Sequence, residues 1–173
     1  MELKYLDRMH KRLAKRGNAS SQIVASMAVL GKPMYESFAA ALLSMGNIHA
    51  PIEKACNFFN NKEWEEQVHL TKSLNKKVPG FGSTFCKGED PIIEEAISQL
   101  PITTIKRIED MRELVHEVFN PSLYPNAALA TAAYAFSNDI NPKEAQFLVL
   151  QGRLRVWKDI YLANYNDCLN LWD

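Results

Sequence analysis

The sequence predicts an all-α fold of about nine helices. Apolar residues recur at helical spacing through most of the chain, and proline, glycine and asparagine residues divide it into segments of helix length. No segment shows the alternation that is typical of a strand. With 173 residues, 47% of them hydrophobic and 23% charged, the chain is long enough to bury a sizeable core.

The N-terminal part of the chain predicts two helices that are separated at Gly17. Residues 2–15 place four apolar side chains on one face of the first helix: Leu3, Leu6, Met9 and Leu13. Asn18 is expected to cap the second helix. The apolar side chains of that helix are Ile23, Val24, Met27 and Leu30. We interpret the basic run KRLAKR at 11–16 as the solvent-facing side of the first helix.

Proline residues mark the starts of the next helices. Pro33 precedes the alanine-rich run YESFAAALLS, whose small side chains allow close helix packing and predict a buried or interfacial helix. Pro51 begins another helix, which ends at Phe59. A charged, exposed helix is expected over about 62–74.

Two loops and a proline separate the remaining helices. The segment KKVPGFGSTFCKGEDP at 76–91 contains glycine turns and ends in an N-cap aspartate followed by a first-turn proline. Pro101 separates a short helix from a long amphipathic one. A second alanine-rich helix covers 126–136, and NPKE at 141–144 resembles a capping box for a last helix that ends near Tyr165.

Composition argues against several classes of function. Twenty basic residues balance twenty acidic ones, so bulk charge does not indicate binding to nucleic acid or to a membrane surface. The cysteines Cys56, Cys86 and Cys168 are widely spaced, which predicts neither a disulfide framework nor a metal site. Because the N-terminus lacks a signal-peptide pattern and no segment has the length and hydropathy of a membrane span, we expect a cytoplasmic protein.

The histidines do not form a recognisable catalytic pattern with serine or cysteine. His10, His69 and His116 lie in charged helical segments, and we expect them to face solvent. His49 differs because it lies in GNIHAPIE, at a break before a helix. A lowered pKa at a helix start suits an imidazole to polarising a carbonyl, although a purely structural role also fits this spacing.

The G-F-G turn in the loop at 76–91 has two interpretations. Gly80 and Gly82 permit a tight turn because glycine adopts positive φ angles. They also leave backbone groups open to a nucleotide, and Lys87 would then reach a phosphate. The turn alone does not decide between a connector and a ligand-binding loop.

Four segments, taken in order, resemble the citrate synthase family. RGNASSQIVASMAVLGKPMYESFAAALLSMGNIHAPIE is similar to the family's N-A-S-T helix, Ala-rich helix and G-P-L-H-G-G-A-N-E motif. KVPGFGSTFCKGEDP resembles its V-P-G-F-G-H-x-V-x-K-x-x-D-P-R loop. LYPNAALATAAYAF resembles L-Y-P-N-V-D-F-x-S-G, and FLVLQGRLRVW resembles the C-terminal F-x-x-A-R-x-x-G-W helix. The match covers about residues 13 to 160.

This resemblance implies an all-α, citrate-synthase-like fold. Large-domain helices would cover 1–52 and 121–173, and a small CoA-binding lobe would be inserted at 53–120. The family forms dimers, which implies a homodimer through the helices at 35–45 and 126–136. Its enzymes join an acyl-CoA to an oxo-acid or cleave such products, so coenzyme A or an acyl-CoA is the implied ligand, without a metal. The chain is shorter than the family's members, whose large domain has a further N-terminal part.

Several residues match functional positions of the family. His49 matches the histidine that polarises the thioester carbonyl. Arg153 matches a carboxylate-binding arginine, although a shift of two residues would substitute Gln151 or Arg155. Lys87 matches a basic residue near the CoA phosphates. The segment whose backbone meets the adenine of CoA is matched by Val78, Pro79, Gly80, Phe81 and Gly82.

Other positions depart from the family's pattern. Ser83 stands where the carbonyl-activating histidine is expected, and Ala128 replaces the aspartate base. Ile92 replaces the arginine after Asp-Pro, and Lys15 lies near the position of a substrate-binding histidine. Alanine cannot accept a proton, and loss of a positioned general base costs about 10²–10⁴-fold in rate. We therefore expect that standard citrate synthesis has been lost.

Three functions are consistent with this pattern. The first is a catalytically degenerate protein that binds CoA or an acyl-CoA, or acts through dimerisation. The second is an enzyme with altered chemistry, a C–C lyase or synthase or a thioester hydrolase, that uses His49 with Ser83 or Glu53. The third is a scaffold subunit that pairs with a full-length citrate synthase.

Overall fold

The structure is a computed structural model that describes residues 3–16, 19–45, 51–83 and 86–169. Within these ranges the chain forms nine helices and no strand, apart from an isolated bridge between Phe81 and Pro125. This confirms the all-α prediction. No helix of the described part is long and apolar enough to cross a membrane. The helices are α1 (Leu3–Ala14), α2 (Ala19–Val29), α3 (Met34–Ser44), α4 (Ile52–Asn60), α5 (Trp64–Ser73), α6 (Pro91–Ile97), α7 (Ile102–Val118), α8 (Ala127–Ser137) and α9 (Pro142–Leu169).

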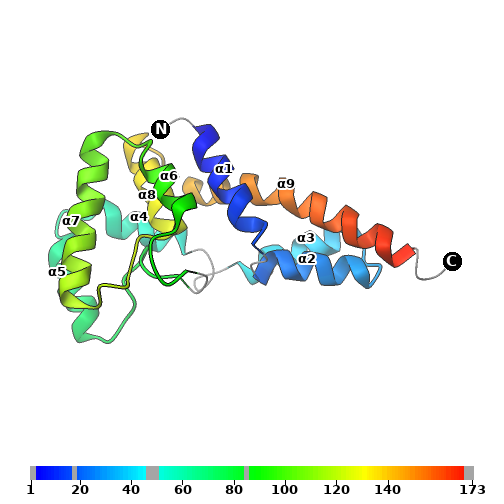
Figure 1. Ribbon diagram of the computed structural model, residues 1–173, viewed down its shortest axis with the longest axis horizontal. Helices are drawn as coiled ribbons and strands as arrows, with labels where there is room; N and C mark the ends of the chain where they lie inside the picture. Colours follow the sequence, from blue (N-terminus) through cyan, green and yellow to red (C-terminus); the bar gives the residue numbers. More distant parts are fainter. Residues whose placement is uncertain (1–2, 17–18, 46–50, 84–85, 170–173) are drawn as a thin grey trace.

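The helices form two groups that α9 connects (Figure 1). α4 to α8 gather at one end of the molecule, while α2 and α3 lie along α9 at the other end. Ala145 and Val149, early in α9, belong to the larger core with α4 and α8. Trp157 and Tyr161, further along α9, form a second core with Val24. One 28-residue helix therefore contributes to both cores.

α8 is the buried centre of the larger group. Every side chain from Ala128 to Ala135 is buried, and Phe58 and Phe59 of the neighbouring α4 are fully buried. Small alanine side chains let the two helix backbones approach closely. The second alanine-rich helix, which the resemblance placed at a dimer interface, is thus buried within this chain.

α3, the first alanine-rich helix, buries only a narrow face. Ser37 and Ala41 are buried, whereas Tyr35 is 73% and Leu43 is 87% exposed. Leu30, predicted on the apolar face of the second helix, lies just after the end of α2 and is 71% exposed. The prediction is therefore wrong for Leu30, whereas Val24 is buried and Ile23 and Met27 are half-buried. The other buried residues of α2 are small: Ser20, Ser21 and Ala28.

The helix termini mostly follow the predicted capping residues. Asp90 caps α6 by accepting a hydrogen bond from the Ile92 amide at 3.0 Å, with Pro91 in the first turn. Asn141 accepts a hydrogen bond from the Lys143 amide at 2.9 Å, at the start of α9. Gly17 and Asn18, the predicted break and cap, lie outside the described residues.

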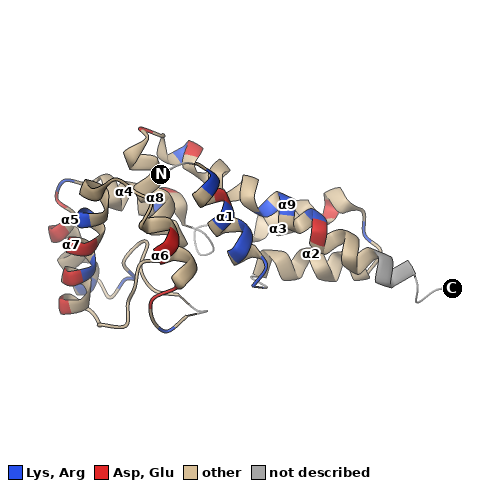
Figure 2. Cartoon of the chain, turned by 45° about the horizontal axis from the view of Figure 1, so that its top comes forward, with Lys and Arg blue, Asp and Glu red and all other residues tan. Residues whose placement is uncertain are grey.

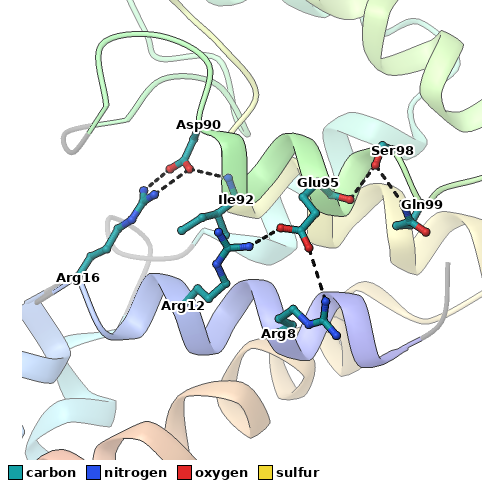
Figure 3. Close-up of polar contacts among 8 residues, drawn as sticks. All are labelled: Arg8, Arg12, Arg16, Asp90, Ile92, Glu95, Ser98 and Gln99. Carbon is teal, nitrogen blue, oxygen red and sulfur yellow. Dashed lines mark hydrogen bonds and ion pairs between the residues drawn. The ribbon is translucent and has the colours of Figure 1, made fainter.

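An arginine row on α1 faces α6, so the basic run at 11–16 is not simply solvent-facing as predicted (Figures 2 and 3). Arg8 lies 3.6 Å from the Glu95 carboxylate, and Arg12 pairs with the same group. Arg16 binds both oxygens of Asp90, one of them at 3.1 Å. Four-residue spacing places Arg8 and Arg12 on one face of α1, and Arg16 continues the row in the turn after the helix. They hold α6, and the loop before it, against α1.

Arg107 of α7 caps the C-terminal end of α4. Its guanidinium donates to the Phe59 carbonyl at 2.8 and 3.1 Å and to the Asn61 carbonyl at 2.7 Å. It also lies over the Phe59 ring, 5.3 Å from its centre. A cation that binds the free carbonyls of a helix end satisfies groups that the helix leaves without partners. Arg107 thereby joins α7 to α4.

The predicted boundaries of the small lobe, at residues 53 and 120, stay a prediction.

Candidate functional site

The loop that sequence comparison assigned to CoA lies against the N-terminal end of α8. The Gly82 amide donates to the Tyr124 carbonyl at 2.9 Å, and the Asn126 amide donates to the Gly80 carbonyl at 2.9 Å. The Asn126 side chain donates to the Gly82 carbonyl, also at 2.9 Å. We call these three hydrogen bonds the Asn126 contact. They hold the loop next to the residues that begin α8.

Asn126 has a second role in the same place. Its side-chain oxygen accepts hydrogen bonds from the Ala128 amide at 2.9 Å and the Leu129 amide at 3.4 Å, which caps α8. One side chain thus satisfies the helix end with its oxygen and the loop with its nitrogen. The sequence predicts a helix over 126–136, but it does not predict that Asn126 caps it.

Two glycines allow the loop to approach α8. Gly80 and Gly82 have φ angles of +85° and +80°, which strain any residue with a Cβ. A Cβ at Gly80 would lie 2.8 Å from a methyl group of Leu129. These glycines therefore permit both the turn and the contact with α8. Their geometry is compatible with a connector and with a ligand-binding loop, and does not decide between them.

The predicted adenine-contacting residues divide into buried and accessible ones. Val78 and Phe81 are 4% and 7% exposed and belong to the large core. Pro79 and Gly82 are half-buried, and Lys87 is exposed. Only this accessible part of the loop can meet a ligand directly, while the buried residues fix its position.

The substituted catalytic positions lie on both sides of the Asn126 contact. Ser83 directly follows Gly82 and is exposed, while Ala128 lies in the first turn of α8 and is 5% exposed. The methyl group of Ala128 can neither accept nor donate a proton. His49 lies outside the described residues.

Three further positions that the sequence analysis singled out lie on or next to other helices. Ile92 is buried in α6, and Lys15 is exposed after the end of α1. Glu53, the alternative partner of His49, is exposed on α4 and accepts a hydrogen bond from Gln146 at 3.4 Å.

Arg153 is the inward-facing arginine of α9. Its guanidinium donates to the Ser20 hydroxyl at 3.2 Å, and burial lowers its pKa. No ion pair among the described residues involves Arg153, whereas Arg155 is exposed and lies 3.5 Å from Asp7. Gln151 is exposed. Of the three residues that the alignment left open, Arg153 alone offers a largely buried cation to an anion.

His10 is buried, so its predicted exposure is wrong. It is 2% exposed, and its Nε2 lies 3.0 Å from the Thr131 hydroxyl. That hydroxyl donates to the Ala127 carbonyl at 2.7 Å, so Nε2 must carry the proton of a neutral imidazole. Burial lowers the pKa of His10 to about 3, the Arg153 charge adds to this shift, and Asp7 opposes it.

The position of His10 could have been found from the helix period. It lies four residues after Leu6 and three before Leu13, so it shares their inward face. Gly152 lets α9 come close, since a Cβ there would lie 2.6 Å from that of His10. The other two histidines differ: His69 is exposed, and His116 is half-buried, 3.1 Å from the Leu123 carbonyl.

Comparison with known proteins supports the fold. No family model matches the sequence, and no curated protein matches it. Among solved structures, a citryl-CoA lyase from Hydrogenobacter thermophilus aligns with a TM-score of 0.71 and 21% identity, over 86% of this chain and 62% of the lyase. A citrate synthase from Thermotoga maritima aligns with a TM-score of 0.70 and 17% identity, over 85% of this chain and 44% of the synthase.

The chain thus has the all-α fold of citrate synthases. The resemblance predicted from four sequence segments is confirmed at the level of the fold. The chain spans less than two thirds of the length of both neighbours.

We predict that Gly80→Ala destabilises the protein by about 1–3 kcal/mol, because the new Cβ strains the turn and meets Leu129. Gly88→Ala is the matched control, since a Cβ at Gly88 would meet nothing within 4 Å, and we expect a change within about 0.5 kcal/mol. Urea unfolding measures both. Equal effects of the two substitutions would contradict the close approach of loop and α8.

We predict that His10 makes stability fall on acidification. Its folded-state pKa of about 3 lies below the ordinary value of 6.5. Between these two pH values, the His10 side chain is protonated in the unfolded chain but not in the folded chain. This stabilisation is complete above pH 6.5 and is lost as pH falls towards 3, with a slope of up to about 1.4 kcal/mol per pH unit. Urea unfolding from pH 7 to 4 should show a shallower slope for His10→Gln than for wild type, whereas exposed His69→Gln should keep the wild-type slope. An unchanged slope in His10→Gln would refute the prediction.

Proposed function

We propose that this chain binds coenzyme A or an acyl-CoA at the accessible side of the loop at Pro79–Lys87, without the catalysis of a citrate synthase. The Asn126 contact is the observation that carries this proposal, because it holds the loop backbone in a fixed conformation beside a helix N-terminus. The amides of Phe81, Gly82 and the first turn of α8 are already bonded within the protein. The loop would therefore meet the adenine through its accessible surface at Pro79 and Gly82, and Lys87 would pair with a phosphate.

Three further points support CoA as the ligand. The loop resembles the family segment whose backbone meets the CoA adenine, and the two aligned solved structures are a citryl-CoA lyase and a citrate synthase. Lys87 is exposed five residues after Gly82, where its ammonium group can pair with a phosphate. On this proposal the loop and Lys87 bind and orient the nucleotide part that CoA and acyl-CoA share.

The proposed loss of catalysis follows from the residues around this loop. Citrate synthesis needs a base at the position of Ala128, and a methyl group cannot remove a proton. Ser83 replaces the histidine that would stabilise charge on the oxo-acid carbonyl, and Ile92 is a buried aliphatic residue where the family has an arginine. Arg153 keeps a buried cation near Ser20, which suits a carboxylate group of an acyl-CoA.

We also propose a homodimer in which α3 is the contact surface. Apolar residues with no cover lie on and beside this helix: Val29, Leu30, Tyr35, Leu42 and Leu43. Contiguous exposed apolar residues favour an interface. α8, the other helix that sequence comparison assigned to the interface, buries its side chains inside the chain, so α3 is the better candidate.

We predict saturable CoA binding that Lys87→Ala weakens about tenfold or more, since a charge-assisted contact to phosphate is lost. Isothermal titration calorimetry measures the affinity. Lys143→Ala, at an exposed position of α9, is the control and should bind like wild type. No heat at millimolar CoA, or equal affinities of the two variants, would overturn the assigned site.

The same samples test the proposed loss of catalysis. Incubation with acetyl-CoA or citryl-CoA should release no free thiol. Thiol release that disappears in His49→Ala would instead establish the alternative, an acyl-CoA lyase or hydrolase with altered catalytic residues.

We predict that the wild-type chain sediments at twice the chain mass and that Leu43→Glu shifts it to the monomer, because a charge cannot be buried at an apolar interface. Leu70→Glu, at an apolar residue of α5 that is 57% exposed, should leave the dimer intact. A wild-type monomer at all concentrations would contradict this proposal, and co-purification with a full-length citrate synthase would favour the scaffold alternative.

A further inference from the structure

A pocket of about 230 Å³ opens between α6 and α7. Its residues come from both helices and from the turn before α8, and they are Glu94, Ile97, Ser98, Ile105, Ile108, Glu109, Arg112 and Pro125. A short connection that contains Pro101 joins the end of α6 to the start of α7. The volume corresponds to about eight water molecules, which is room for a small organic group.

The apolar part of the pocket is preformed. Ile97 and Ile108 are 5% and 3% exposed, and Pro125 is buried. These residues are held by the same core as α8, so the walls do not depend on the ligand for their position. An apolar surface of this kind favours a ligand with an aromatic or branched aliphatic body.

The polar part of the pocket carries excess negative charge. Among the described residues, neither Glu94 nor Glu109 has a hydrogen-bond or ion-pair partner. Arg112 is the cation of the pocket, but its guanidinium binds Glu89 at 3.3 Å. Burial raises the pKa of Glu94, and the charges of Glu89 and Asp90 add to this while Arg112 opposes it. A charged Glu94 is therefore only partly compensated, through the charge of Arg112.

We propose that this pocket binds a small amphiphilic cation. Its primary ammonium group would pair with Glu94 and Glu109, and its apolar body would lie on the isoleucines. An anionic ligand would instead meet two carboxylates and an arginine that is already paired. The proposal does not rest on CoA binding, since it uses α6 and α7 side chains and not Lys87.

The test uses 2-phenylethylamine as the probe, titrated into the full chain and followed by two-dimensional NMR. 2-Phenylethanol is the uncharged control of similar size, and 3-phenylpropanoate is the anionic one. Glu94→Gln and Glu109→Gln each remove one carboxylate charge from the pocket. Glu113→Gln makes the same change on an exposed part of α7 that does not line the pocket.

The expected result is that the amine binds more tightly than the alcohol and the carboxylate, with shifts in α6 and α7. Glu94→Gln should weaken amine binding about tenfold. Glu109→Gln should weaken it less, because this residue is more exposed. Glu113→Gln should leave amine binding unchanged. Equal binding of amine and alcohol, tighter binding of the carboxylate, or no binding at 10 mM amine would each overturn the proposal.

Discussion

The arrangement of the site depends on the hydrogen bonds of the Asn126 side chain. With its oxygen it caps α8, the buried centre of the larger core, and with its nitrogen it holds the Gly82 carbonyl. The glycine turn can approach only because Gly80 has no Cβ against Leu129. The side-chain amide of Asn126 therefore links α8 to the loop that resembles a CoA-binding segment.

The sequence predicted most of the fold and the position of this loop. Helix periods and capping residues such as Asp90 are local, so they can be read without knowing the tertiary structure. His10 was misjudged because its charged neighbours outweighed its place between Leu6 and Leu13. The pairing of Arg16 with Asp90 joins residues that are far apart in the sequence, and no local pattern predicts it. The role of Arg153 stays a prediction. Its partial burial, which distinguishes it from the exposed Arg155, depends on the packing of α9 and could not be read from the sequence.

The site combines a preserved framework with changed chemistry. The loop conformation, the cap of α8 and the half-buried Arg153 form the framework to which the proposed function assigns ligand binding. The resemblance predicts that Ser83 and Ala128 replace the residues for charge stabilisation and proton transfer, and alanine supplies neither. Stability and binding can persist under such substitutions, since the framework is held by core packing and by backbone hydrogen bonds. This is the physical basis of the proposal that the chain binds CoA without the catalysis of a citrate synthase.

An NMR titration of the isotopically labelled chain with CoA tests this account most directly, because it locates the ligand as well as detecting it. The account predicts saturable amide shifts in the loop at 79–83, around Lys87 and in the first turn of α8, which the Asn126 contact joins to the loop. Shifts confined to other helices, or no shifts at millimolar CoA, would contradict it.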